Sequence, residues 1–154
     1  MAEPHLTDSN VLLRLVKRDH PDYPLVRRAV AVLHQRGAAL YYTLQNMAEF
    51  WNVSTRPLDR NGFGLSVAEA DEGACEIEQT FTLLPDSAAV YREWRRLVVV
   101  YRVRGAKVHD ARLAAVLSAY GLRHLLTMNE ADFGRYPGVV VVTPENLAGA
   151  STPS

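Results

Sequence analysis

Residues 109–145, HDARLAAVLSAYGLRHLLTMNEADFGRYPGVVVVTPE, carry the pattern that decides the fold. Apolar residues recur at helical spacing from about Val108 to Tyr120, and a glycine then ends the pattern. Two short apolar runs follow, at 122–127 and 139–142, and both are typical of strands covered on both faces. The stretch therefore predicts one part of a parallel sheet with helical crossovers.

The same alternation extends back to the N-terminus. Further strands are expected at residues 5–7, 38–42 and 82–84, and helices at about 9–16, 24–35, 43–54, 66–81 and 87–102. The last of these helices contains LVVVY, but Val90, Trp94 and Leu97 keep a spacing of three or four residues. We therefore expect one α/β domain with a central parallel sheet of four to five strands flanked by helices.

Domain limits follow from composition. Residues 1–147 are expected to form the domain, and residues 148–154, AGASTPS, a disordered tail. The single cysteine, Cys75, excludes an intramolecular disulfide. No signal peptide is evident, and no apolar run approaches the ~20 residues of a membrane span. These features favour a cytoplasmic protein with no membrane partner.

Charge is balanced overall but uneven along the chain. The 17 lysines and arginines match 17 acids, which argues against a protein that coats nucleic acid. Residues 69–78 are acidic and residues 92–107 are basic. Both runs are expected to be solvated helix faces. The alternative for the basic run is that Arg92, Arg95 and Arg96 hold an RNA backbone beside a nearby site.

Polar side chains lie where ligands of open parallel sheets bind, at the carboxyl ends of the expected strands or on adjoining helices. In chain order these residues are Asp8, Glu49, Asp110, Asn129 and Asp132. Carboxylate oxygens are the ligands that Mg²⁺ prefers, and carboxylates held close together repel unless a cation lies among them. The joint placement predicts a metal-dependent phosphodiesterase site.

Each of these residues also has an ordinary structural explanation. Asp8 and Asp110 could be first-turn or capping acids, which the helix dipole favours. Glu49 could be a solvated helix residue, and Asp132 could cap the FGRYPG turn. The hypothesis therefore depends on the whole set rather than on any single member.

Three segments resemble PIN domains. LTDSNVLLRL is similar to their opening motif, and LQNMAEFWNVSTRP is similar to their second motif with its acid at Glu49. Residues 109–145 resemble the third and fourth motifs almost end to end. The resemblance covers about residues 5–147. It implies a single PIN-type domain and a Mg²⁺-dependent endoribonuclease, for which Mn²⁺ can substitute. Many small members are toxins of the VapC type, each encoded beside an antitoxin that blocks the acidic site.

The resemblance also implies roles for individual residues. The catalytic residues would be Asp8, Glu49, Asp110 and Asn129, with Asp8 and Asp110 as the metal ligands. Glu49 would complete the acidic cluster and help to orient the attacking water. Asn10, Thr127 and Asp132 would position these groups from outside the ligand set.

One position departs from the family pattern. Asn129 stands where many relatives carry an acid, so it offers a carbonyl oxygen but no charge, and a one-metal mechanism becomes more plausible. The alternative function is a catalytically weak PIN-fold protein that acts as a binding or assembly partner. A small-molecule phosphohydrolase is a third possibility. The expected partners are RNA, a cognate antitoxin and a second copy of the chain in a homodimer.

Overall fold

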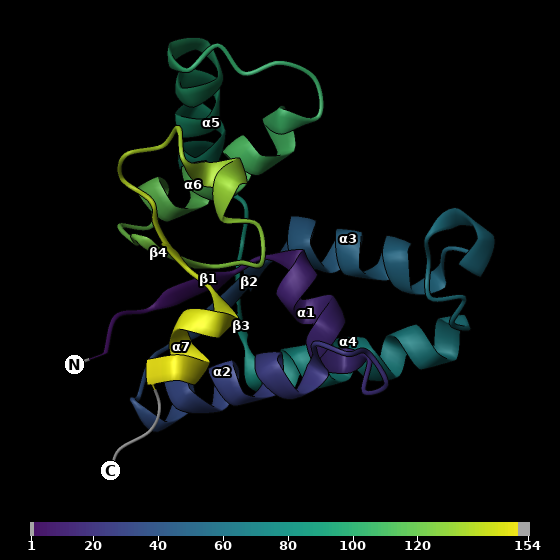
Figure 1. Ribbon diagram of the computed structural model, residues 1–154. Helices are drawn as coiled ribbons and strands as arrows, with labels where there is room; N and C mark the ends of the chain where they lie inside the picture. The colour runs from purple at the N-terminus through teal and green to yellow at the C-terminus, as the bar shows by residue number, and fades with distance from the viewer. Residues whose placement is uncertain (1, 151–154) are drawn as a thin grey trace.

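The computed structural model describes residues 2–150, which form a five-stranded parallel sheet between two layers of helices (Figure 1). The strand order is β3-β2-β1-β4-β5, and every neighbouring pair is parallel. The strands are β1 (His5–Thr7), β2 (Leu40–Thr43), β3 (Thr82–Leu84), β4 (His124–Leu126) and β5 (Val140–Val142). The α/β class and the parallel sheet predicted from the sequence are confirmed.

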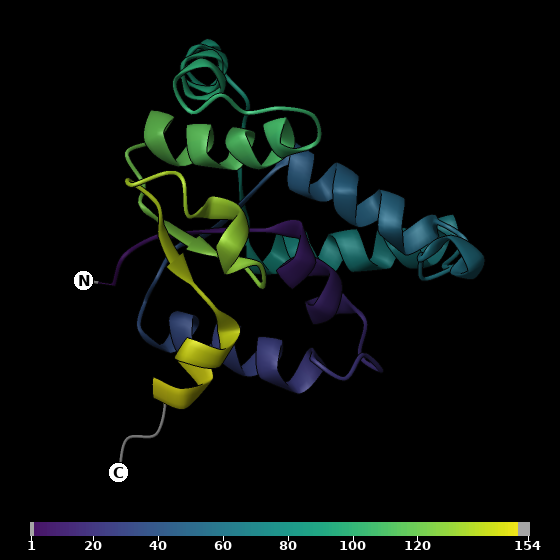
Figure 2. The same ribbon diagram turned by 45° about the horizontal axis from the view of Figure 1, so that its top comes forward.

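Helices cover both faces of this sheet. They are α1 (Ser9–Val16), α2 (Tyr23–Gln35), α3 (Leu44–Thr55), α4 (Val67–Thr80), α5 (Ala88–Val100), α6 (Lys107–Ala119) and α7 (Pro144–Ala150), with short 3₁₀ turns η1 (Leu58–Arg60) and η2 (Glu130–Phe133). Figure 2 shows α5 and α6 on one side of the strands and α2 and α7 on the other. Residues 88–100 are helical, as their spacing predicted.

Two hydrophobic cores result from this layering, because successive strand residues point to opposite faces. Leu125 packs with buried residues of α5 and α6, whereas its neighbour Leu126 packs with those of α1, α2 and α3. Both leucines are fully buried. The edge strand β5 differs from the expected doubly covered strand, because Val140 is exposed and Val141 and Val142 are only half-buried.

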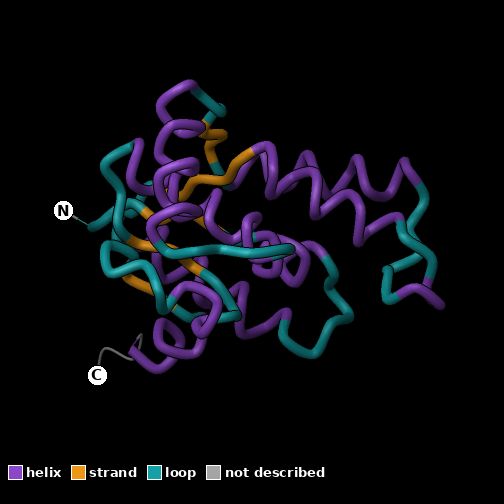
Figure 3. The backbone as a smooth tube through the Cα atoms, turned by 90° about the horizontal axis from the view of Figure 1, so that it is seen from above, coloured by secondary structure: helices purple, strands orange, loops and turns teal. Residues whose placement is uncertain are grey.

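The helices α3 and α4 run side by side and project away from the strands (Figure 3). Each begins with a capping box, at Thr43 and Ser66, in which side chain and backbone satisfy each other's hydrogen bonds. Gly73 permits close packing, since a Cβ there would lie 2.7 Å from Val16 Cγ1 and 2.8 Å from Phe50 Cζ. The projecting pair thereby stays anchored to α1.

The C-terminal segment differs from the disordered tail that the sequence predicts. Residues 148–150 were expected to be disordered, but they complete α7, which packs against α2 through buried Leu147. The remainder of the expected tail, residues 151–154, lies outside the described residues. Within residues 2–150, no helix combines the length and apolar character that crossing a membrane requires.

Candidate metal centre

The strand order places a crevice at the carboxyl end of β1. From this central strand the chain continues to β2 and then β3 on one side, and it returns from β3 past β1 to β4 on the other side, so the strand order reverses at β1. Asp8 follows β1 directly, and its backbone N–H donates to the carbonyl of Leu126 in β4. Asp8 is also the N-cap of α1, which confirms its structural explanation, and its role as a metal ligand stays a prediction.

The Asp8 carboxylate is buried and held by neutral donors. The backbone N–H of Ser9 donates to Oδ1 at 2.7 Å, and the hydroxyl of Thr127 donates to Oδ2 at 2.9 Å. The amide of Asn10 donates at 3.3 Å both to Asp8 Oδ2 and to Thr127 Oγ1. Asn10 in turn accepts from the backbone N–H of Met128 at 3.1 Å, which ties β4 to the start of α1.

Burial raises the pKa of Asp8 from 3.8 to about 6. The hydrogen bonds from Thr127 and Ser9 oppose this rise, while the negative charges of Glu49 and Asp110 add to it. A carboxylate in this position is destabilised by dehydration and by its acidic neighbours. A positive charge placed among them would relieve both effects.

Glu49 enters the cluster from α3, where it is half-buried. The hydroxyl of Ser9 donates to Oε2 at 2.5 Å, and the amide of Gln45 donates to Oε1 at 3.0 Å. The same Gln45 amide donates to the carbonyl oxygen of His109 at 2.9 Å. Gln45 therefore joins the first turn of α3 to the first turn of α6, which lie side by side in Figure 2.

Asp110 and Asp132 form the outer part of the cluster with Lys107. The Lys107 ammonium lies 2.7 Å from Asp132 Oδ1 and 4.0 Å from Asp110 Oδ2. Burial raises the pKa of Asp110, as do the charges of Asp132 and Glu49, whereas Lys107 lowers it. The position of Asp132 beside the cluster was predicted from the sequence, whereas the contact of Lys107, one helical turn before Asp110, was not.

The donor chemistry fits a hard divalent cation. Asp8, Glu49 and Asp110 offer carboxylate oxygens, and their mutual repulsion shows in the pKa of Asp8. As they are placed, however, no three His, Cys, Asp or Glu side chains within residues 2–150 already enclose an ion position. Binding a cation therefore requires these carboxylates to close in on it.

Thr127 and Asn129, which the sequence also predicts at the site, differ in how they contact the acidic cluster. Thr127 is fully buried and bridges Asp8 and Asn129, accepting from the Asn129 backbone N–H at 3.1 Å. The side chain of Asn129 is exposed and does not cap η2. Asn129 thus contacts the cluster through its backbone, and a direct catalytic role for its amide stays a prediction.

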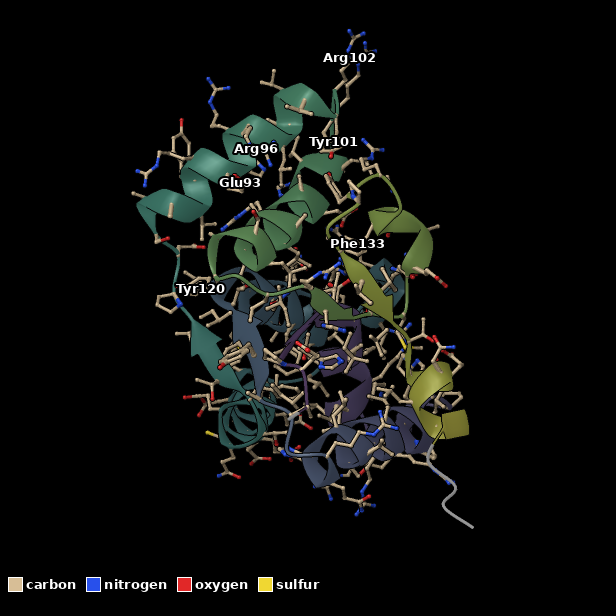
Figure 4. The ribbon with its side chains drawn as sticks, turned by 90° about the vertical axis from the view of Figure 1, so that its left-hand side faces the viewer. Glu93, Arg96, Tyr101, Arg102, Tyr120 and Phe133 are labelled. Carbon is tan, nitrogen blue, oxygen red and sulfur yellow. The ribbon has the colours of Figure 1, made fainter. Side chains whose placement is uncertain are left out.

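The three arginines expected to bind RNA lie on α5. Arg96 is paired with Glu93, and Figure 4 shows the two side chains together on this helix. Glu93 also accepts from the hydroxyl of Ser118 near the end of α6, at 3.0 Å, whereas Asp110 lies in its first turn. Arg92 and Arg95 are exposed and pair with no acid among the described residues. Contact of these arginines with RNA stays a prediction.

Ser9 and Gln45 are further residues of the site that the sequence analysis did not single out. Both hold Glu49, and Ser9 also contacts Asp8. The available signals were adjacency for Ser9 and the four-residue helical spacing between Gln45 and Glu49. Neither signal indicates on its own which partner the side chain will choose.

The fold of this chain is similar to that of several solved structures, although its sequence matches no family model and no curated protein. Among solved structures, VapBC2 from Rickettsia felis bound to a promoter DNA fragment is similar, with TM-score 0.67, 12% identity and coverage of 90% of this chain and 97% of that chain. A toxin–antitoxin complex from Klebsiella pneumoniae has TM-score 0.63 and 21% identity, with coverage of 91% and 97%.

A third similar structure is VapC20 from Mycobacterium tuberculosis, a toxin that cleaves the sarcin–ricin loop. It has TM-score 0.62 and 15% identity, and the match covers 83% of this chain and 92% of that chain. At these identities the likeness concerns the fold. The chain therefore has the fold of VapC-type toxins, as its resemblance to PIN domains predicted.

Proposed function

We propose that this protein is a metal-dependent endoribonuclease that hydrolyses RNA phosphodiester bonds and serves as the toxin of a toxin–antitoxin pair. The observation that carries the proposal is the buried Asp8 carboxylate at the end of β1, with a pKa raised to about 6 and with Glu49 and Asp110 as charged neighbours. A folded protein retains such an unfavourable arrangement most readily where function needs it. The fold shared with VapC-type toxins adds support.

In this proposal Asp8 and Asp110 hold Mg²⁺, or Mn²⁺ in its place, and Glu49 completes the acidic cluster. The bound ion would polarise the scissile phosphate and lower the pKa of a nearby water. Thr127 and Asn10 keep the Asp8 carboxylate in one orientation. Ser9 and Gln45 hold the Glu49 carboxylate in place, where it would orient the attacking water.

Lys107 has a separate task in this scheme. Its ammonium lies against Asp132 and near Asp110, at the outer side of the cluster. A positive charge there offsets repulsion between the acids and the phosphate that must approach them. A cognate antitoxin belongs to the same proposal, supported by the toxin–antitoxin complexes among the similar structures. A homodimeric assembly is proposed with it, on the resemblance of the sequence to PIN domains alone.

Cleavage of total RNA by the purified protein tests the proposal. We expect cutting with Mg²⁺ or Mn²⁺ that EDTA abolishes and that Asp8→Ala abolishes. The exposed side chain of Asn129 favours the alternative, a PIN-fold binding protein with weak or lost catalysis. Folded protein that is free of antitoxin, binds RNA and cuts none with either metal would establish that alternative instead. Turnover of nucleotides without cleavage of RNA would indicate a small-molecule phosphohydrolase.

A further inference from the structure

A cavity of about 500 Å³ lies between the beginnings of α5 and α6. Its volume is within the range of about 300–1,000 Å³ that is typical of small-molecule sites. Val90, Tyr91 and Trp94 line it from α5, and Val108, His109 and Arg112 line it from α6. The mechanism proposed above uses none of these side chains.

The cavity adjoins the acidic cluster through α6. His109 lines the cavity, and the next residue in the chain is Asp110. The His109 carbonyl oxygen accepts from Gln45, whose amide also donates to Glu49. The acidic cluster and the cavity therefore share the first turn of α6, and a ligand that extends along this turn would contact both.

Aromatic side chains form one wall. The indole N–H of Trp94 donates to the carbonyl of Val108 at 2.9 Å, which holds the ring against α6. Tyr91 is 59% exposed, and its ring centroid lies 6.3 Å from that of Trp94 with an angle of 36° between the planes. Buried Val90 lies behind them. Such a wall suits a flat apolar group that inserts from solvent and stacks.

The surroundings favour an anionic ligand. Arg112 and Asp86 line the cavity and pair with each other at 3.2 Å. Their guanidinium and carboxylate groups can offer hydrogen bonds to a ligand. The unpaired Arg92 and Arg95 directly follow the two aromatic residues of α5. The aromatic wall, the polar groups of the lining and the two arginines that neighbour the aromatic residues on α5 together match a nucleobase attached to a phosphodiester chain.

We propose that this cavity, lined by Tyr91 and Trp94, is a subsite for an unpaired base of the RNA substrate, next to the bond that is cut. The inference rests on the proposed function and makes it more specific, since it assigns a base-binding role to Tyr91 and Trp94. A base paired within a duplex keeps its faces stacked on its neighbours and cannot insert.

Binding of a labelled single-stranded RNA of about ten nucleotides tests this subsite. The protein is the full chain carrying Asp8→Asn, with EDTA present, so that the RNA stays intact. Adding Tyr91→Ala is expected to weaken binding about tenfold, which is the loss expected for one stacked base. Tyr91→Phe keeps the ring and should keep the affinity. Val99→Ala removes an exposed apolar side chain from the other end of α5 and should have no effect.

A second RNA separates base stacking from contacts to phosphate. Abasic RNA of the same length should bind more weakly, and Tyr91→Ala should not weaken it further. Equal affinity of Tyr91→Ala and the parent for intact RNA would overturn the subsite. So would conversion of a dimer to a monomer by Tyr91→Ala with RNA binding unchanged, because the cavity would then hold a second copy of the chain.

Failure of the subsite is distinguishable from failure of the proposed function. Wild-type protein that cleaves RNA with Mn²⁺, together with a Tyr91→Ala variant that binds normally, would remove the subsite and leave the nuclease. Wild-type protein that neither binds nor cleaves RNA would remove both. Equal thermal unfolding midpoints for the Tyr91 variants and their parent would exclude misfolding as the cause of weaker binding.

Discussion

Replacing Asp8 with asparagine is expected to stabilise the metal-free protein while abolishing its proposed activity. Asp8 is 8% exposed, and burial raises the pKa of its carboxyl group from 3.8 to about 6 in the folded chain. That difference corresponds to about 3 kcal/mol by which ionised Asp8 opposes folding. Asparagine has nearly the same shape and cannot ionise.

The gain is smaller than this value because asparagine has one acceptor oxygen. Thr127 and Asn10 both donate to Asp8 Oδ2, whereas Ser9 donates to Oδ1. An amide nitrogen at either position loses at least one of these bonds, at a cost of about 1 kcal/mol. The net stabilisation at pH 7.5 is therefore about 1–2 kcal/mol, or roughly 3–6 °C in the unfolding midpoint.

The pH dependence has a definite sign. Because folding raises the pKa of Asp8, the folded state holds the proton more tightly, and the penalty is absent below about pH 4. It grows as pH rises toward 6 and is complete at 7.5. Urea unfolding in EDTA should therefore find Asp8→Asn more stable than wild type at pH 7.5 and no more stable at pH 4.

Asp59→Asn replaces an exposed aspartate on η1 and serves as the matched control, with no gain expected at either pH. Added Mn²⁺ should stabilise wild type and leave Asp8→Asn unchanged, because ligands that bind the folded state raise stability. A variant no more stable than wild type at pH 7.5, or equally stabilised at pH 4, would refute the reasoning.

Three further predictions concern other parts of the molecule. Lys107→Met should tighten Mn²⁺ binding several-fold in calorimetric titrations, because it removes a positive charge that competes with the metal ion for Asp110. Unchanged affinity would show that Lys107 does not compete with the ion. Thr127→Val removes a buried hydroxyl and should lower the free energy of unfolding in urea by about 1–3 kcal/mol. It should also shift the acidic limb of the pH–activity profile to higher pH, because the hydrogen bond from Thr127 lowers the pKa of Asp8. An unshifted limb would show that Thr127 does not act on the pKa of Asp8. Gly73→Ala should destabilise by about 1–3 kcal/mol through its clash with Phe50, and a neutral thermal midpoint would contradict that packing.

The fold was accessible from the sequence because helix and strand periods differ. The run LVVVY is β-branched, yet Leu97 is buried while Val99 and Val100 are exposed, as a helix with one apolar face requires. The helix α7 was not predicted, because an isolated segment of seven residues that includes a glycine has little helical tendency of its own. Its stability comes from Leu147 packing on α2, a contact that only the folded chain supplies.

The grouping of Asp8, Glu49 and Asp110 could be predicted from the sequence, but the hydrogen bonds that hold them could not. The end of β1 dictates where Asp8 lies, and the helix α6, which leads into the neighbouring strand β4, brings Asp110 near it. Which donors hold each acid depends on how closely the first turns of α3 and α6 approach each other. The bridge from Gln45 to His109 is a consequence of that approach, so local sequence spacing could not predict it. The pairing of Arg96 with Glu93, by contrast, is a contact between residues three apart within α5, a spacing that is visible in the sequence.

The two halves of the acidic cluster are treated differently by the chain. Asp8 receives hydrogen bonds from neutral groups such as Thr127, which orient the carboxylate without cancelling its charge. Asp110 and Asp132 lie beside Lys107, so part of their charge is already offset. The neutral donors leave the negative charge of Asp8 uncompensated, so electrostatic attraction would hold an added cation most strongly beside Asp8. This asymmetry agrees with an uncharged residue at position 129 and favours one tightly held ion over two.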